Sequence, residues 1–115
     1  VAKVQDYIRK NPDKRLSLND VAAVFNFSPG YLSQLFSQNG QTSFVEFVTE
    51  TRISAAKELM ASTDLKIYEI SERLGFESAF YFSKVFKKIE GVSPRAYLQK
   101  LRGGPGARED SADVD

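Results

Sequence analysis

Residues 21–36 read VAAVFNFSPGYLSQLF, and residues 70–86 read ISERLGFESAFYFSKVF. The two stretches align when the chain is shifted against itself by about 50 residues. The aligned pairs are Phe25-Asn26-Phe27 with Leu74-Gly75-Phe76, Ser28 with Ser78, Leu32 with Phe82, Ser33 with Ser83, Phe36 with Phe86, and Gly40 with Gly91. The offset grows by one residue at each loop, as helices of equal length joined by slightly different turns require. The chain therefore contains an internal repeat.

Each copy of the repeat meets the requirements of a helix-turn-helix. Two short helices that cross steeply need a small residue where their backbones approach, and a residue that tolerates positive φ in the turn. The first copy supplies Ala22 and Asn26, and the second supplies Ser71 and Gly75. Glycine and asparagine are the residues that adopt the left-handed conformation cheaply. Two such matches in register predict a duplicated helix-turn-helix and favour DNA binding.

The rest of the chain up to residue 102 is also predicted to be helical, because alternating β-branched residues are absent and the separators are short. Helix starts are marked by a capping box at Ser43 and Glu46, and by Ser-Pro pairs at Ser28 and Ser93. The expected helices span about 1–10, 18–25, 29–39, 43–61, 67–74, 78–89 and 93–102. The fold class is therefore all-α, with seven helices. Residues 1–102 form the predicted domain, in which helix-turn-helix units at about 17–39 and 66–89 are joined by the long linker helix 43–61.

The composition excludes several classes of site. The chain has 115 residues, no Cys and no His, so disulfide scaffolds, zinc fingers and His- or Cys-dependent nucleophilic catalysis are excluded. We expect no metal and no cofactor. No apolar stretch approaches the roughly 20 residues that a membrane span needs, and we expect no membrane partner.

The charge is unevenly distributed although the net charge is only +1. Residues 103–115 hold Arg108 against four acidic residues, and the Gly- and Pro-containing start of this tail predicts a disordered acidic segment. Residues 1–102 hold the other 15 basic and 11 acidic residues. Their basic excess is concentrated after residue 83, which is typical either of a solvated surface or of a nucleic-acid contact.

The linker helix has a length suited to DNA. At 1.5 Å per residue, its 19 residues span roughly 28 Å, close to the ~34 Å between successive major-groove faces on one side of the duplex. Its inward residues should be Phe44, Phe47, Val48, Ala55, Ala56, Leu59 and Met60. We therefore expect the helices at about 29–38 and 78–89 to enter adjacent major grooves.

The residues that face the groove follow from helical periodicity. Core stripes are predicted at Leu32, Leu35 and Phe36, and at Phe82, Val85, Phe86 and Ile89. The opposite faces give the predicted base-contacting residues Gly30, Ser33, Gln34, Ser37, Phe80, Ser83 and Lys84. Gln34 can pair with adenine, Lys84 can reach guanine or a phosphate, and Phe80 can contact a thymine methyl. The alternative for Phe80 is a lid over the core beside Tyr81.

Phosphate contacts are predicted at helix starts and at cations. The residues are Ser17, Ser43, Ile67 and Ser93 at helix starts, and the side chains of Arg52, Lys87, Lys88 and Arg95. Arg52 has an alternative role as an ion-pair partner of Glu46 or Asp20.

Several segments resemble the DNA-binding domain of the AraC/XylS family of transcriptional regulators. Residues 17–36 are similar to its first half, residues 52–60 to its linker helix, and residues 67–98 to its second-half signature. The resemblance covers about 1–102 and implies a seven-helix double helix-turn-helix, usually at the C-terminus of a longer regulator. It implies double-stranded DNA and RNA polymerase as partners, an N-terminal regulatory domain that this chain lacks, and a cytoplasmic bacterial protein. The pattern of matching residues is close to that of two-component response regulators that carry this output domain.

Two departures from the family pattern and one alternative function deserve note. The family often has small polar residues where Ala79 and Phe80 stand. The acidic tail of this chain is not a family feature. The alternative function is a protein-interaction module that contacts RNA polymerase or a partner domain through Tyr31, Phe80 or the first helix. We do not expect an enzyme, because Glu46 and Glu50 are flanked by basic residues as in surface ion pairs and no nucleophile or base assembles around them.

Overall fold

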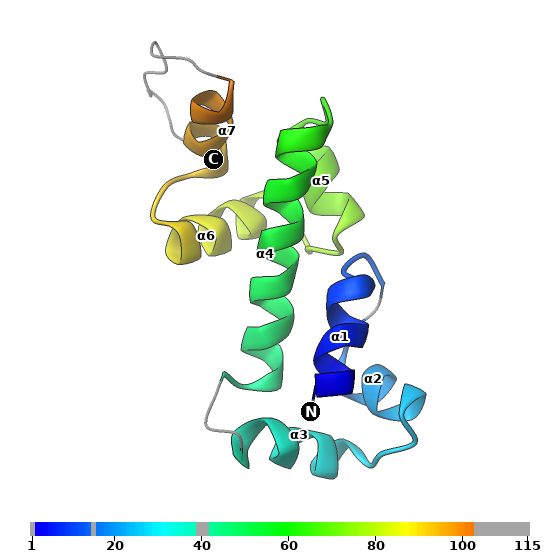
Figure 1. Cartoon of the computed structure of the whole chain (residues 1–115). Helices are drawn as coiled ribbons and strands as arrows, with labels where there is room; N and C mark the ends of the chain where they lie inside the picture. The colour runs from blue at the N-terminus through cyan, green and yellow to red at the C-terminus, as the bar shows by residue number, and fades with distance from the viewer. Residues whose placement is uncertain (1, 15, 39–41, 103–115) are drawn as a thin grey trace. The chain divides into compact units, whose positions relative to one another are not determined.

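The structure is a computed structural model, and it describes residues 2–14, 16–38 and 42–102 (Figure 1). Within these residues all regular structure is helical. The helices are α1 (Ala2–Lys10), α2 (Leu18–Val24), α3 (Pro29–Gln38), α4 (Phe44–Ser62), α5 (Ile67–Arg73), α6 (Ala79–Glu90) and α7 (Pro94–Leu101). The all-α prediction is confirmed, and each helix lies within a residue or two of its expected bounds. The predicted acidic tail and Gly40 fall outside the described residues.

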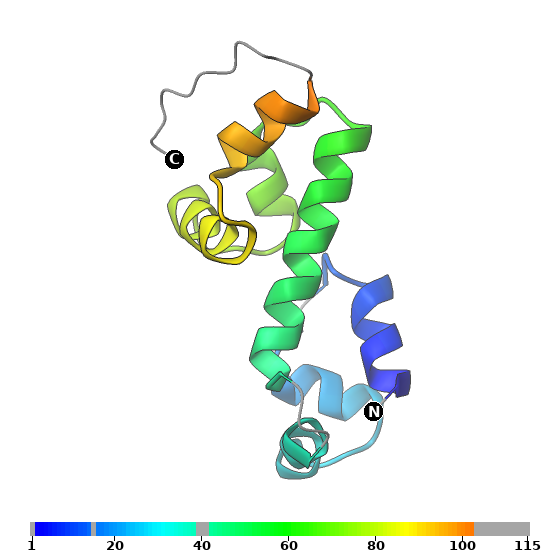
Figure 2. The same ribbon diagram turned by 60° about the vertical axis from the view of Figure 1, so that its left-hand side comes forward.

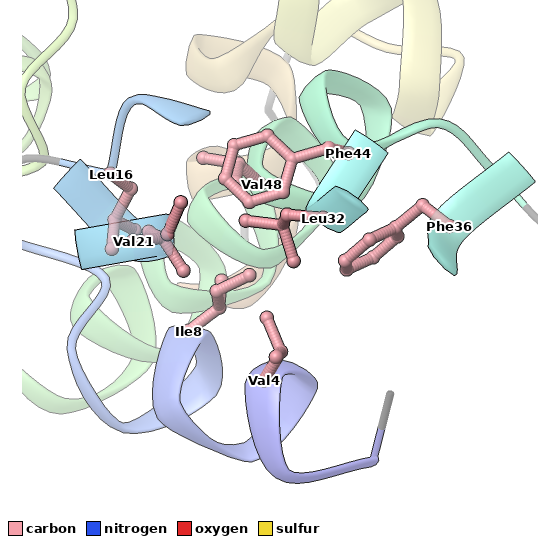
Figure 3. Close-up of a cluster of buried hydrophobic side chains, with 9 residues drawn as sticks. Val4, Ile8, Leu16, Val21, Leu32, Phe36, Phe44 and Val48 are labelled. Atoms are coloured by element: carbon pink, nitrogen blue, oxygen red, sulfur yellow. The ribbon is translucent and has the colours of Figure 1, made fainter. Parts of the chain in front are cut away.

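The chain divides into two compact units, Val1–Arg52 and Ile53–Asp115. The first unit contains α1, α2, α3 and the first half of α4, and Figure 3 shows how their apolar side chains point toward one another. Its buried residues are Val4, Ile8, Leu16, Val21, Ala22, Leu32, Phe36, Phe44 and Val48. Phe36 packs edge-on against Phe44 with ring centroids 5.5 Å apart. This core holds α3 by one side only.

The second unit contains the second half of α4 and α5, α6 and α7, whose ribbons Figure 2 shows, and their apolar side chains build a core of its own. Its buried residues are Ile53, Ala56, Met60, Ile70, Leu74, Phe82 and Phe86. Tyr97 of α7 packs edge-on against Phe86. Ile53 is fully buried although it was absent from the predicted inward set. Conversely, Ile89 was expected in the core stripe and is 40% exposed, because it lies in the last turn of α6, beyond the buried Phe86.

The turns of the two helix-turn-helix units have the predicted backbone conformation. Asn26 has φ 59° and Gly75 has φ 82°, both in the left-handed region. The residue after each turn donates its N–H back to the small residue of the first helix: Phe27 to the carbonyl of Ala22 at 2.9 Å, and Phe76 to that of Ser71 at 3.1 Å. Ala22 and Ser71 are both buried. The two turns are therefore equivalent in backbone geometry as well as in sequence.

The second helix of each helix-turn-helix unit, α3 or α6, begins with a serine cap of the same kind. The hydroxyl of Ser28 accepts the N–H of Tyr31 at 3.1 Å, and that of Ser78 accepts the N–H of Tyr81 at 3.0 Å. The predicted capping box at α4 is also present, because the N–H of Ser43 donates to a carboxylate oxygen of Glu46 while the Ser43 hydroxyl accepts the Glu46 N–H. Such caps satisfy backbone donors that the first turn leaves free.

Candidate nucleic-acid interface

The outward face of α3 is polar and uncharged. Gly30, Ser33, Gln34 and Ser37 are all exposed, on the opposite side from the buried Leu32 and Phe36. An added Cβ at Gly30 would meet nothing within 4 Å, so the protein itself does not require glycine there. A bare backbone at this place leaves room for a ligand to come close to the helix.

The outward face of α6 combines an aromatic ring with three lysines. Phe80 is 70% exposed, and the ammonium Nζ of Lys84 lies 5.5 Å from the centroid of its ring. Lys87 and Lys88 continue the exposed face, and within the described residues none of these lysines has a carboxylate within ion-pair distance. The alternative of Phe80 as a lid over the core is wrong, because the ring lies in solvent against a lysine.

Ser83 departs from its expected position. Helical periodicity put it on the outward face with Lys84, but it is only 4% exposed. On a helix of 3.6 residues per turn, Ser83 lies about 60° from Phe86, and the packed surface of α6 is wide enough to include it. In this structure its hydroxyl is not available to a base, whereas the equivalent Ser33 of α3 is exposed.

The predicted phosphate-contacting helix starts fall into two groups. Three of them already have a carboxylate in the first turn that accepts a hydrogen bond. Asp20 accepts a bond from the Ser17 hydroxyl at 2.8 Å, and Glu46 accepts one from the N–H of Ser43. Glu69 accepts one at 2.7 Å from the N–H of Lys66, the residue before Ile67. A fixed carboxylate opposes the approach of a phosphate. The α7 start differs, because its first turn has no acidic residue and the exposed Arg95 follows Ser93.

Arg52 is engaged with the backbone of its own unit. Its Nε donates to the carbonyl of Pro12 at 3.3 Å and its Nη2 donates to that of Lys14 at 3.0 Å. Partial burial lowers the pKa of the Arg52 guanidinium from its ordinary value by desolvation. The alternative ion pair is wrong, because within the described residues Arg52 pairs with neither Glu46 nor Asp20. The guanidinium therefore fastens the segment between α1 and α2 to α4.

Two tyrosines were not among the predicted DNA-contacting residues. Tyr31 and Tyr81 occupy the third position of α3 and of α6, and they are 49% and 50% exposed. The signal that could have identified them is their identity at an offset of 50 in the repeat.

Other kinds of site find no support in the part of the chain that is described. No group of three or more acidic residues there is arranged to hold a metal ion. None of the described helices combines the length and the apolar character needed to cross a membrane.

Comparison with known proteins gives a consistent set of matches. A family model described as a helix-turn-helix domain matches residues 21–100. An uncharacterised HTH-type transcriptional regulator of Escherichia coli, YpdC, is 33% identical over 98 residues, which are 85% of this chain and 34% of that protein. The chain thus spans about a third of the length of this curated relative.

Solved structures match over most of the chain. The C-terminal domain of AraT, a response regulator from Geobacillus stearothermophilus, is 38% identical with a TM-score of 0.78, covering 99% of this chain and 89% of that one. A transcriptional regulator from Chromobacterium violaceum, described as having an AraC-type DNA-binding domain, is 25% identical with a TM-score of 0.80, covering 87% and 89%.

Proposed function

The chain belongs to the AraC-type family of helix-turn-helix DNA-binding domains, which are not enzymes, and on that premise we propose that it binds double-stranded DNA sequence-specifically to regulate transcription. The observation that carries this proposal is the pair of equivalent helices, α3 and α6, each held by one side in its own core with an exposed polar or basic side opposite. We call α3 and α6 the recognition helices. In a helix-turn-helix the second helix enters the major groove, which agrees with their place after each turn.

The two recognition helices would contribute different chemistry. On α3, Gln34 would pair with adenine, while Ser33 and Ser37 would bond base edges and Gly30 would allow close approach. On α6, Phe80 would contact a thymine methyl and Lys84 would contact guanine. The exposure of these side chains supports the assignment. Ser83 is withdrawn from the base-contacting set because of its burial.

Backbone contacts would come chiefly from the second unit. Lys87, Lys88 and Arg95 are exposed cations. The α7 start after Ser93 presents the N–H of Arg95 without a competing carboxylate, since Pro94 has no N–H and that of Ala96 donates to the Ser93 hydroxyl. Ser17, Ser43 and Ile67 remain weaker proposals because each lies beside an acidic residue. Arg52 remains a proposal through the two N–H groups of its Nη1 and the second N–H of its Nη2, since its Nε and one N–H of Nη2 donate to carbonyl groups.

The finer arrangement is also a proposal. We infer that the recognition helices occupy adjacent major grooves, and the support is the length of α4, whose 19 residues contribute to both cores as a linker helix would. As part of a longer regulator, the domain would act in the cytoplasm with a regulatory domain and with RNA polymerase. These last partners rest on family membership.

Selection of duplexes from a random pool tests the proposal directly. We expect one sequence pattern to be enriched, with an affinity that falls with salt by a log–log slope equivalent to roughly 4–8 phosphates. Equal affinity for all duplexes, or binding that is insensitive to salt, would refute the proposed function.

A further inference from the structure

The internal repeat can be used as an alignment of two DNA-binding units that face different bases. Residues that contact bases are expected to differ between the units, as Gly30 differs from Phe80 and Gln34 from Lys84. The sugar-phosphate backbone is chemically the same at every site, so residues that contact it are free to stay identical. An exposed residue that is identical in both units is therefore a candidate for backbone contact.

Tyr31 and Tyr81 form such a pair, separated by 50 residues in the sequence. Identical residues that are buried, such as Phe36 and Phe86, are explained by the cores, and Ser28 and Ser78 are explained by their caps. Neither explanation covers the tyrosine hydroxyls. Both side chains are half exposed, and within the described residues neither hydroxyl has a hydrogen-bond partner.

The two rings pack against equivalent phenylalanines, although the contact is closer and edge-on for Tyr31 and more distant and tilted for Tyr81. Tyr31 packs edge-on against Phe27 with centroids 5.0 Å apart, and Tyr81 packs against Phe76 with centroids 6.3 Å apart. Phe27 and Phe76 are the residues that follow the two left-handed turn positions. Each ring is thus placed over its turn at the start of a recognition helix, because helical side chains tilt toward the helix N-terminus. The ring is anchored on one phenylalanine while about half of the tyrosine stays exposed.

We propose that the hydroxyls of Tyr31 and Tyr81 each donate a hydrogen bond to a phosphate of the DNA backbone. The inference rests on the proposed function of DNA binding. A phenol is a neutral donor, so its bond to a phosphate is charge-assisted but displaces no counterion by itself. This property distinguishes a tyrosine contact from a lysine contact.

A competing explanation gives the tyrosines a role in the fold only. The contacts with Phe27 and Phe76 involve the rings, and phenylalanine at positions 31 and 81 would preserve them. Replacing tyrosine by phenylalanine therefore removes the proposed phosphate contact and keeps the packing.

The experiment compares the unmodified 115-residue chain with Y31F, Y81F and the double variant. The probes are a tightly bound duplex selected from a random pool and an unselected duplex of the same length. Tyr7→Phe is the matched control, because Tyr7 also packs edge-on against a phenylalanine, Phe25, but lies in α1 outside the recognition helices. Circular dichroism melting of every variant checks the fold.

We expect each single variant to bind both duplexes about threefold to tenfold more weakly, and the two losses to multiply in the double variant. The preference among single-base variants and the salt slope should not change, and Tyr7→Phe should bind as the unmodified chain does. Replacing one phosphate at a time by uncharged methylphosphonate should then show that each tyrosine variant has lost sensitivity at one phosphate.

Three results would overturn the proposal. Unchanged affinity of Y31F and Y81F would reduce the tyrosines to packing residues. A changed base preference would make them base-contacting residues, and an affinity loss that follows a lowered melting temperature would assign the hydroxyls to the fold. Failure of the proposed function is a separate result, because it appears as lack of selective binding by the unmodified chain.

Discussion

Replacing Arg52 by methionine should destabilise the first unit without acting on DNA contacts of the second. Methionine keeps much of the aliphatic stem but removes the donors that reach Pro12 and Lys14. A hydrogen bond contributes roughly 0.5–1.5 kcal/mol net, and more when one partner is charged. One of these bonds is long at 3.3 Å and the other is exposed, so both belong at the low end. We expect a total loss of about 1–2 kcal/mol in the free energy of unfolding.

Thermal and urea unfolding followed by circular dichroism measure this loss. For a domain of 60–100 residues, 1 kcal/mol corresponds to a fall of about 4–8 °C in Tm. Arg95→Met is the control, because Arg95 is exposed and its side chain has no hydrogen bond or ion pair within the described residues; its effect should stay within about 0.5 kcal/mol. DNA affinity is then measured well below the lower Tm. An unchanged Tm would refute the reasoning, and if affinity also fell tenfold with a reduced salt slope, the proposed phosphate contact would be the only role left to Arg52.

Four further substitutions separate the roles of the other residues. Gln34→Ala should relax base preference at one position by about 1–3 kcal/mol, measured by titration against single-base duplex variants, and an unchanged profile would contradict the adenine assignment. Lys87→Ala should weaken binding to all sequences alike and reduce the salt slope by about 1, so a loss confined to one sequence would argue against a phosphate contact. Gly75→Ala should lower the free energy of unfolding by about 1–2 kcal/mol in thermal melts, because φ is 82° there. Asn26→Gly in the equivalent turn should change the free energy of unfolding by no more than about a few tenths of a kcal/mol, since glycine accepts positive φ. Equal effects of the two substitutions would contradict the shared turn geometry.

Local chemistry explains why so much of the fold was predictable. The starts of α3 and α6 depend on a serine and on residues within four positions of it, and the turns depend on single residues that accept positive φ, such as Asn26 and Gly75. The repeat supplied a second, independent copy of each of these signals. Bounds and turns therefore followed from residues that are neighbours in the sequence.

The features that could not be predicted depend on residues far apart in the chain. The carbonyl partners of Arg52 lie 38 and 40 positions away, beyond the reach of any periodicity argument. The burial of Ser83 depends on how wide a surface of α6 is packed, which a single helix cannot reveal. The bond from the N–H of Lys66 to Glu69 is different, because it joins residues three positions apart and is as local as the predicted bond from the N–H of Ser43 to Glu46.

The uncharged outward face of α3 has a consequence for how such a regulator acquires new target genes. Attraction to bulk chromosomal DNA depends on cations, and α3 contributes none, whereas α6 carries three lysines. If α3 contacts bases as proposed, exchanges among its small polar residues would change which promoters are bound and leave the non-specific affinity for chromosomal DNA nearly constant. On α6, gain or loss of a lysine would alter the base preference and the non-specific affinity for DNA together. We therefore expect changes of target sequence during evolution to arise more often on α3.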